Sequence, residues 1–473
     1  MAITRISHSS SDIILILAFM SIIVFTQQQQ QDSTPPLALD PSEQEALYRV
    51  LESVNSAIPW RTIFPDDLCS SAPDGVVCDF FSSENGVVTS VHVTELSFGY
   101  VSDYSPNPPC SSNSTLDPLL FTAFKHLRKL FFYKCFTGSR VPAPGTMPEG
   151  FGFSLEEMVF MENPGLVGEL GGMIGNFTKL RRLVLTGNGL YGSIPSQIGD
   201  LVSLQEITLS RNSLSGRVPG NLTRLKNLKV LDLSHNFFDG NAPASIGDLV
   251  ELLKLDLSFN GFSSEIPSGV GNLKRIEFLD LSYNRFSNSG VPLFLGDMPR
   301  LKEIHLSGNR LGGRIPEIWR NLGAVLGIGF SGMRLEGKIP ASMAANLRNL
   351  SYLLLDNNRL EGQVPQEFGL LEFAGEINLE NNNLSGTVLF PDGFTGRIGK
   401  KLRLGGNPDL CVDRGTKIDS QDLKFCPRRD NELVSALSRD GLSSSPISAA
   451  FRSAYSSRML VAMVLYVFFV GRD

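Results

Sequence analysis

A period of 24 or 25 residues runs through most of the chain and limits the folds that it can adopt. The period is carried by a column of asparagines, each with apolar residues eight, five and three positions before it. For Asn236 these residues are Leu228, Leu231 and Leu233. The asparagine column consists of Asn163, Asn188, Asn212, Asn236, Asn260, Asn284, Asn309, Met333, Asn358, Asn382 and Asn407, with Met333 as the exception. Steps of such constant length indicate an array of stacked repeats.

The apolar pattern within each repeat predicts a short strand followed by a tight turn. Leu231 and Leu233 are two positions apart, so both side chains point toward the core from the same face of a strand. One repeat cannot bury this face alone, whereas stacked repeats pair their strands into a sheet over a continuous core. The amide of each column asparagine can bond to main-chain groups in the turn. We therefore predict an α/β fold, a right-handed leucine-rich-repeat solenoid with a parallel β-sheet on the concave face and disulfide-stapled terminal caps.

The period stops before both ends of the chain, where a solenoid needs a cap over its exposed core. Asp40, Pro41 and Glu43 have the pattern of a helix N-terminus with a capping box, and a first strand is predicted at 88–93. The predicted domains are 1–26, a signal peptide; 27–98, the N-terminal cap; 99–406, the repeat array; 407–427, the C-terminal cap; 428–458, a Ser-rich linker; and 459–473, a hydrophobic tail.

The two ends predict export and attachment to a membrane. Residues 13–25 are apolar and follow Arg5, which is the pattern of a secretory signal peptide. The apolar run at 459–470 would span about 18 Å as a helix, short of the roughly 30 Å hydrocarbon core of a bilayer. Together with the small and polar residues of 443–458, it fits the signal for a glycolipid anchor. A short membrane span and a soluble tail are the alternatives.

Cysteines and glycosylation sequons also fit an exported protein. An even number of cysteines in such a chain suggests disulfides, although six cysteines allow 15 pairings and free buried thiols are the alternative. The cysteines form three close pairs in sequence: Cys69 and Cys78, Cys110 and Cys135, Cys411 and Cys426. None of these pairs has the spacing of a zinc site. Five Asn-x-Ser/Thr sequons predict glycosylation at Asn113, Asn176, Asn221, Asn349 and Asn383.

The strand positions that should face solvent carry the candidate partner-binding residues. Four positions before the asparagine, three consecutive repeats have an aspartate; we call Asp232, Asp256 and Asp280 the aspartate column. Charged and aromatic residues accompany it on the same predicted face: Lys254, Phe259, Phe278, Tyr283, His305 and Tyr352. One interpretation is an acidic, aromatic-edged patch for a basic partner. The other is ordinary repeat consensus whose charge nearby lysines neutralise.

The Met333 repeat differs from the others on this predicted face. Gly327, Gly329 and Gly332 leave its strand and turn without side chains. These glycines indicate either close approach by a partner or tolerated sequence drift, and drift is favoured.

The sequence argues against several other classes of function. It contains no Gly-x-Ser-x-Gly, no His-Glu-x-x-His and no phosphate-binding loop, so we predict that the protein is not an enzyme and has no cofactor or metal. A net charge of −6 on 473 residues argues against a nucleic-acid partner.

A narrower marker is the block at 126–136, together with the pair Cys110 and Cys135 and the repeat ending Gly-x-Ile-Pro. Over roughly residues 40–430 the chain resembles plant receptor-like proteins of the Too Many Mouths group, particularly the Piriformospora indica-insensitive proteins. The resemblance implies a membrane-anchored protein on the outer face of the plasma membrane. It would lack a kinase and act with receptor kinases in responses to extracellular peptides or microbial proteins.

One departure from that resemblance is that no Trp lies between Cys69 and Cys78, where many plant caps have one. The rival function is a secreted inhibitor of microbial cell-wall-degrading enzymes, built on the same repeats. An inhibitor that acts in the wall would not need the apolar tail.

Overall fold

The computed structural model describes residues 37–83, 85–101, 107–415, 418 and 423–427. The described residues up to Cys426 belong to one compact unit, called the first unit. The predicted signal peptide, Ser-rich linker and hydrophobic tail therefore lie outside the described residues. Within the described ranges, no helix has the length and apolar character needed to cross a bilayer.

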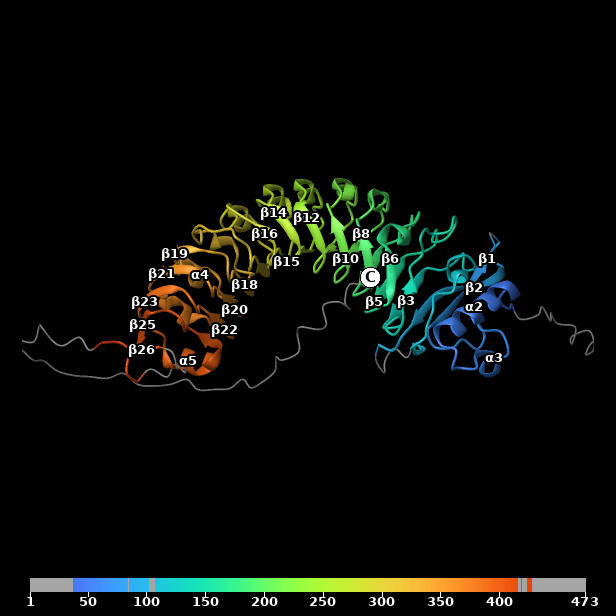
Figure 1. Cartoon of the computed structure of the whole chain (residues 1–473), viewed down its shortest axis with the longest axis horizontal. Helices are drawn as coiled ribbons and strands as arrows, with labels where there is room; N and C mark the ends of the chain where they lie inside the picture. Colours follow the sequence, from blue (N-terminus) through green and yellow to red (C-terminus); the bar gives the residue numbers. More distant parts are fainter. Residues whose placement is uncertain (1–36, 84, 102–106, 416–417, 419–422, 428–473) are drawn as a thin grey trace, which may run out of the picture. The chain divides into compact units, whose positions relative to one another are not determined.

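A long sheet with one strand from each repeat is the main feature of the first unit. β1 pairs antiparallel with β2, and every later strand pairs in parallel with its neighbour in chain order. Strands such as β15, β18 and β20 lie on the inner side of the arc of repeats (Figure 1), so the predicted concave parallel sheet is confirmed. The strands of this sheet are β1 (Val76–Ser82), β2 (Val88–Phe98), β3 (Lys129–Tyr133), β5 (Glu157–Met161), β7 (Arg182–Thr186), β9 (Glu206–Thr208), β11 (Val230–Asp232), β13 (Lys254–Asp256), β15 (Phe278–Asp280), β17 (Glu303–His305), β18 (Gly327–Gly329), β20 (Tyr352–Leu354), β22 (Glu376–Asn378) and β24 (Leu402–Arg403).

A second set of strands, most of them directly after a residue of the asparagine column, forms two further sheets. The first contains β4 (Val141–Pro142), β6 (Leu166–Glu169), β8 (Gly189–Gly192), β10 (Ser213–Gly216), β12 (Phe237–Asn241), β14 (Gly261–Ser264) and β16 (Arg285–Phe286). The second contains β19 (Glu336–Lys338), β21 (Arg359–Gly362), β23 (Asn383–Thr387), β25 (Asp409–Val412) and β26 (Lys424–Phe425). These strands begin the return path of each repeat.

A helical turn completes the return path of most repeats. The Pro of the repeat ending directly precedes many of these turns, as Pro195 and Pro219 do, because its fixed φ suits the residue before a helix. The turns are η1 (Pro118–Phe121), η2 (Leu170–Met173), η3 (Ser196–Asp200), η4 (Gly220–Arg224), η5 (Ala244–Asp248), η6 (Ser268–Asn272), η7 (Leu293–Asp297), η8 (Trp319–Asn321), α4 (Ala341–Asn346), η9 (Gln366–Leu370), α5 (Asp392–Ile398) and η10 (Gly399–Lys401).

The core lies between the long sheet and the helical turns. Its leucines are buried, and the Phe residues that follow the asparagine column stack from repeat to repeat, as Phe238 does on Phe262 with ring centroids 6.3 Å apart. Asn236 is buried, and its Nδ2 donates to the Leu209 carbonyl of the preceding repeat (2.9 Å) and to its own turn. Its Oδ1 accepts from the Leu214 N–H (3.0 Å). The predicted role of the asparagine column is confirmed.

The N-terminal cap begins with α2 (Pro41–Val54), followed by the short α3 (Trp60–Ile63). Asp40 accepts from the N–H groups of Ser42 and Glu43, as predicted. The predicted capping box is wrong in its second half, because Glu43 accepts instead from the Val93 N–H (3.0 Å) and contacts His92 Nδ1 (2.8 Å). Glu43 thereby attaches α2 to β2.

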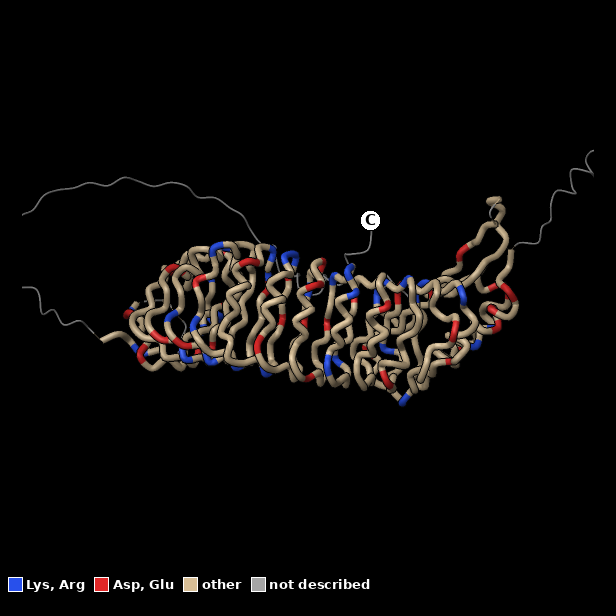
Figure 2. The backbone as a smooth tube through the Cα atoms, turned by 90° about the horizontal axis from the view of Figure 1, so that it is seen from above, with Lys and Arg blue, Asp and Glu red and all other residues tan. Residues whose placement is uncertain are grey.

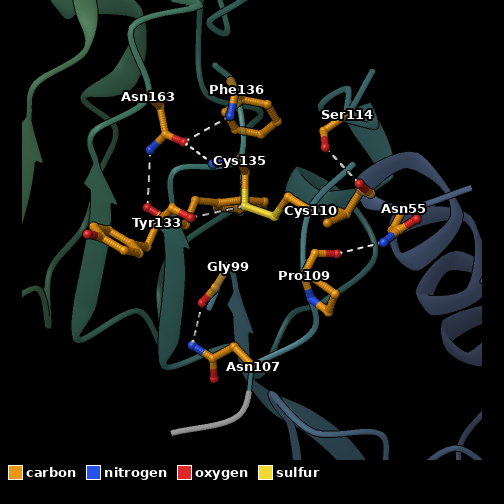
Figure 3. Close-up of a disulfide and its surroundings, with 12 residues drawn as sticks. Asn55, Gly99, Asn107, Pro109, Cys110, Ser114, Tyr133, Cys135, Phe136 and Asn163 are labelled. Atoms are coloured by element: carbon orange, nitrogen blue, oxygen red, sulfur yellow. Dashed lines mark hydrogen bonds between the residues drawn. A yellow bond between two sulfur atoms is a disulfide. The ribbon is translucent and has the colours of Figure 1, made fainter. Parts of the chain in front are cut away.

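Disulfides join all three cysteine pairs: Cys69–Cys78, Cys110–Cys135 and Cys411–Cys426. Figure 3 shows that the segment with Cys110 lies between α2 and the start of the repeats. On one side Asn55 donates to the Pro109 carbonyl (2.8 Å), and on the other Asn163 accepts from the Cys135 N–H (2.8 Å). This disulfide therefore connects the N-terminal cap to the array, while Cys411–Cys426 closes the C-terminal end.

Candidate partner-binding surface

The aspartate column forms as predicted, but two of its members are buried. Sheet register places Asp256 between Asp232 and Asp280. Asp232 and Asp256 are only 7% and 8% exposed, whereas Asp280 is half-buried. Asp232 Oδ1 accepts from both the N–H (3.1 Å) and the Oγ–H (2.7 Å) of Ser234, and the other two aspartates have the same bonds to the Ser two residues later. The expected solvent-facing position is therefore wrong for Asp232 and Asp256, because the fold uses their carboxylates to close the turn.

Lys254 neutralises part of the aspartate column. Its Nζ lies 2.8 Å from Asp232 Oδ2 and 3.8 Å from Asp256 Oδ2, and 5.3 Å from the centre of the Phe278 ring. Burial opposes the charge of Lys254, but the two aspartates outweigh it and raise its pKa. Burial, followed by repulsion from Asp232 and Asp280, raises the pKa of Asp256 to about 7. Lys254 thus compensates the charge of one carboxylate of the column, and no ion pair of Asp280 is found among the described residues.

Three stacked aromatic rings stand in the position just before the asparagine column. We call His235, Phe259 and Tyr283 the aromatic ladder. Ring centroids are 4.1 Å apart between the first two and 4.3 Å between the last two, with interplanar angles of 11° and 19°. Phe259 and Tyr283 are 41% and 52% exposed, and His235 is exposed as well. A stack this open to solvent has the composition of a protein-binding surface.

The backbone beneath the aromatic ladder is left-handed, with φ of 53°, 52° and 52° at its three residues. Bulky side chains rarely adopt this conformation, which costs on the order of 1–3 kcal/mol per residue. Six other repeats hold a residue that tolerates it better, and two hold Glu162 and Arg211 with the same conformation; the six are Gly187, Gly308, Gly332, Asn357, Asn381 and Gly406. The turn therefore does not require aromatic side chains at this position.

The glycines of the Met333 repeat make room for side chains of the neighbouring repeats. A Cβ on Gly327 would lie 2.0 Å from the Tyr352 ring, and a Cβ on Gly329 would lie 2.8 Å from His305 Nδ1. The Tyr352 hydroxyl donates a hydrogen bond across β18 to Glu303, which lies two repeats earlier, and its Oη is 3.2 Å from His305 Nε2. An intramolecular contact thus explains Gly327 and Gly329, so the predicted drift is not needed for them.

This cluster affects the titration of two of the predicted site residues. Burial and then the hydrogen bond to Glu303 raise the pKa of Tyr352. Burial opposes protonation of His305, but Glu303 and Asp280 outweigh it and raise its pKa. The ring of Phe278 lies 5.7 Å from His305 and links the cluster to Lys254. The role of these residues in binding a partner remains a prediction.

Sequence reasoning missed a row of arginines directly after the asparagine column. Four consecutive repeats carry it, and we call Arg285, Arg310, Arg334 and Arg359 the arginine row. All four are exposed, and in the part of the chain that the structure describes none of their guanidinium groups forms an ion pair or a hydrogen bond. Some arginines of other repeats do have partners: Arg224 pairs with Asp200 at 2.6 Å, and Arg182 bridges Glu157 and Glu206. The signal in the sequence was an Arg after the column residue in four successive repeats.

The predicted glycosylation sites lie away from the long sheet. Asn113, Asn176, Asn349 and Asn383 are exposed, and Asn383 lies in β23. Asn221 is half-buried, and its Nδ2 donates to the Ser196 carbonyl, which makes it the least accessible acceptor. None of these asparagines belongs to the aromatic ladder, whereas Asn383 follows the asparagine column one repeat after Arg359.

Comparisons with known proteins agree with this geometry. Models described as "Leucine rich repeat" match residues 178–238 and 202–262, and a second such model matches residues 300–322 and 349–371. The fold is a leucine-rich-repeat solenoid. It is similar to the ectodomain of the Arabidopsis thaliana receptor kinase GASSHO1/SCHENGEN3, with a TM-score of 0.59 and 24% identity over 78% of this chain and 47% of that chain. Identity at this level supports the fold alone.

Two curated Arabidopsis thaliana proteins are similar in sequence. "Piriformospora indica-insensitive protein 2" is 37% identical over 151 residues, which are 32% of this chain and 34% of that protein. "Protein TOO MANY MOUTHS" is 33% identical over 142 residues, 30% of this chain and 27% of that protein. The matches span about a third of the length of these relatives. Within that span, the predicted resemblance to plant receptor-like proteins is confirmed.

Proposed function

We propose that this protein is a non-enzymatic recognition protein on the outer face of the plant plasma membrane. It would act with receptor kinases in the perception of extracellular peptides or microbial proteins. The resemblance to plant receptor-like proteins supports this class of function, and the leucine-rich-repeat fold supplies a long concave surface for it.

The observation that carries the proposal is the aromatic ladder. Its rings are exposed and stand on backbone that glycine or asparagine occupies in other repeats with less strain. A feature that costs stability without serving the turn is expected where another molecule is bound. Aromatic side chains also dominate the energetics of protein interfaces. We therefore place the kinase or ligand contact at the aromatic ladder.

The test is affinity purification of the tagged full chain from intact plant membranes, followed by identification of the co-purified proteins. Phe259→Asn together with Tyr283→Asn removes two rings and places at both positions a residue that already occupies the equivalent positions 357 and 381. Phe373→Asn is the matched control, because Phe373 is 62% exposed and lies outside the ladder. Receptor kinases should co-purify with the parent and the control and be lost from the double variant.

Two other results would count against the proposal. If no receptor kinase is enriched with the parent chain and microbial cell-wall-degrading enzymes are enriched instead, the inhibitor function is the better explanation. If the double variant retains the kinases, the aromatic ladder is not the contact.

We also propose that a glycolipid anchors the protein, although residues 428–473 lie outside the described part of the chain. Phosphatidylinositol-specific phospholipase C should then release the protein from membranes. Mass spectrometry of the mature protein should find no peptide C-terminal to about residue 445. Detection of a terminal peptide with Arg472 and Asp473 would favour a short membrane span or a soluble tail instead.

A further inference from the structure

We propose that the arginine row, together with the Tyr283 end of the aromatic ladder, binds an extended acidic peptide segment. This inference rests on the proposed function, because it names the ligand class that the recognition surface takes. On one interpretation, the sequence predicts a basic partner for the aspartate column. The inference replaces it with an acidic partner, because among the described residues the exposed charges without intramolecular partners near the aromatic ladder are those of the arginine row.

The charges around the arginine row favour an acidic ligand. Two further basic side chains, Arg314 and Lys338, are exposed on the neighbouring return strands, where Glu336 and Glu361 are the acidic ones. Basic groups therefore outnumber acidic groups along these repeats. Figure 2 shows basic and acidic residues interspersed along the first unit, so four successive unpaired arginines are a local feature. Exposed guanidinium groups without partners bind carboxylates through charge-assisted hydrogen bonds.

The spacing of the arginine row suits a peptide in extended conformation. Neighbouring strands lie about 4.8 Å apart, so the three intervals between Arg285 and Arg359 cover about 14 Å. An extended peptide rises about 3.3 Å per residue and would cover this distance with four or five residues. Several carboxylates of one short segment could thus each reach a guanidinium group.

Of two glycines beside the row, Gly332 leaves space for a peptide backbone, and the Tyr283 ring fills the space over Gly308. Gly308 and Gly332 hold the position before the asparagine column in the repeats of Arg310 and Arg334. A Cβ on Gly332 would meet no atom within 4 Å, whereas one on Gly308 would lie 2.7 Å from the Tyr283 ring. Glycine at such positions permits close approach of another main chain.

The junction with the aromatic ladder favours a peptide over a uniform polyanion. Tyr283 and Arg285 flank the buried Asn284 in one repeat, so the last ring of the ladder stands next to the first arginine of the row. A uniform polyanion would use the arginines only. A peptide can combine an aromatic or apolar side chain at one end with carboxylates at the other, and this order matches both parts of the surface.

Arg334 gives a second sign of a role beyond the fold. Its backbone has a φ of 63°, a left-handed conformation that favours glycine. Because this arginine has no intramolecular partner among the described residues, its side chain does not stabilise the fold, and glycine would fit the backbone better. Its charge is therefore best explained by a ligand.

The test measures fluorescence anisotropy of a fluorescein-labelled synthetic peptide with one tryptophan, two glycines and five glutamates in that order. The full chain is expressed in plant cells as the parent and as two charge variants. Arg310→Glu with Arg334→Glu reverses two members of the row. Arg300→Glu with Arg320→Glu makes the same change in net charge at exposed arginines outside the row. Thermal melts verify that both variants are folded.

The parent should bind the glutamate peptide more weakly as salt rises, and a matched peptide with glutamines should bind at least about tenfold more weakly. The row variant should lose about tenfold in affinity for the glutamate peptide, while the control variant stays within about twofold. Tyr283→Asn should weaken binding of this peptide but not of a peptide that lacks the tryptophan.

Three results would overturn the inference. These are no binding of the glutamate peptide by the parent, equal loss in the two charge variants, and polygalacturonate binding that exceeds peptide binding and does not respond to Tyr283→Asn. Affinity purification of receptor kinases with the row variant tests the proposed function separately from this inference. Capture with loss of peptide binding supports both ideas, whereas capture with unchanged peptide binding overturns only the inference. Absence of capture by the parent overturns only the proposed function.

Discussion

The aspartate column and the arginine row lie in neighbouring repeats, yet the fold treats their charges in opposite ways. Asp232 and Asp256 are buried and bonded to serines of their own turns, and Lys254 pairs with Asp232. Arg310 and Arg334 are exposed and, among the described residues, unpaired. A charge that pairs within the fold is less available to a partner than an exposed charge without an intramolecular partner. The chemistry of the partner is therefore better read from the arginine row.

The largest expected effect concerns the asparagine column, on which both regions depend. Asn236→Ala, in the region of the aspartate column, removes one donor and one acceptor that serve buried main-chain groups, each costing about 1–3 kcal/mol. Met333→Asn, in the region of the arginine row, restores an amide at the column position and should be neutral or stabilising. Thermal melts that rank these two variants in the opposite order would refute the role assigned to the column.

The repeat period was sufficient to predict the parallel sheet and the buried asparagines, and the capping pattern of Asp40 and Pro41 predicted the helix that follows. The antiparallel strand β1 was missed, because it precedes the first regular repeat and has no period to reveal it. The burial of Asp256 was also missed. Ser258 and Lys254 both contact the Asp256 carboxylate. Lys254 also pairs with Asp232 of the preceding repeat, and this contact between repeats is not visible within one repeat of the sequence.

The left-handed backbone of the aromatic ladder could have been inferred from the sequence. Gly and Asn alternate with larger residues at the same position of successive repeats, which is the composition of a left-handed turn residue. The arginine row was visible in the sequence too. The sequence cannot show that Arg310 has no partner, since Glu303 and Glu317 are near it in the chain but form no ion pair with it in the described structure.

A smaller difference in the free energy of unfolding is expected between a variant of Asp232, in the aspartate column, and a variant of Arg334, in the arginine row. Asp232→Ala leaves Lys254 with only the more distant Asp256 and leaves the Ser234 N–H without its acceptor, so it should cost about 1–3 kcal/mol. Arg334→Gly relieves a left-handed backbone and removes no intramolecular contact, so it should be neutral or stabilising by up to about 1 kcal/mol. Chemical denaturation measures both changes. A loss of stability in Arg334→Gly equal to that in Asp232→Ala would mean that the arginine row is structural as well.

The smallest effect is a pH dependence of stability that belongs to the aspartate column. The pKa of Asp256 is raised to about 7 in the folded protein from an ordinary value of 3.8. The folded state therefore holds a proton that the unfolded state has released, and the associated stability is present below about pH 4 and lost as pH rises through about 7. Asp256→Asn should reduce the fall in melting temperature between pH 5 and pH 8. The same fall in this variant and in the parent would show that Asp256 is not its source.

The central claim is that the arginine row, and not the aspartate column, determines the charge of the partner. The direct measurement is the salt dependence of binding of the labelled glutamate peptide and of its lysine counterpart, for the parent and two variants. One variant carries Asp232→Asn, Asp256→Asn and Asp280→Asn, and the other carries Arg310→Glu and Arg334→Glu. We expect the parent and the aspartate variant to bind the glutamate peptide with the same steep salt dependence, and the arginine variant to lose both affinity and slope. Preferential binding of the lysine peptide by the parent, abolished in the aspartate variant and retained in the arginine variant, would contradict the claim.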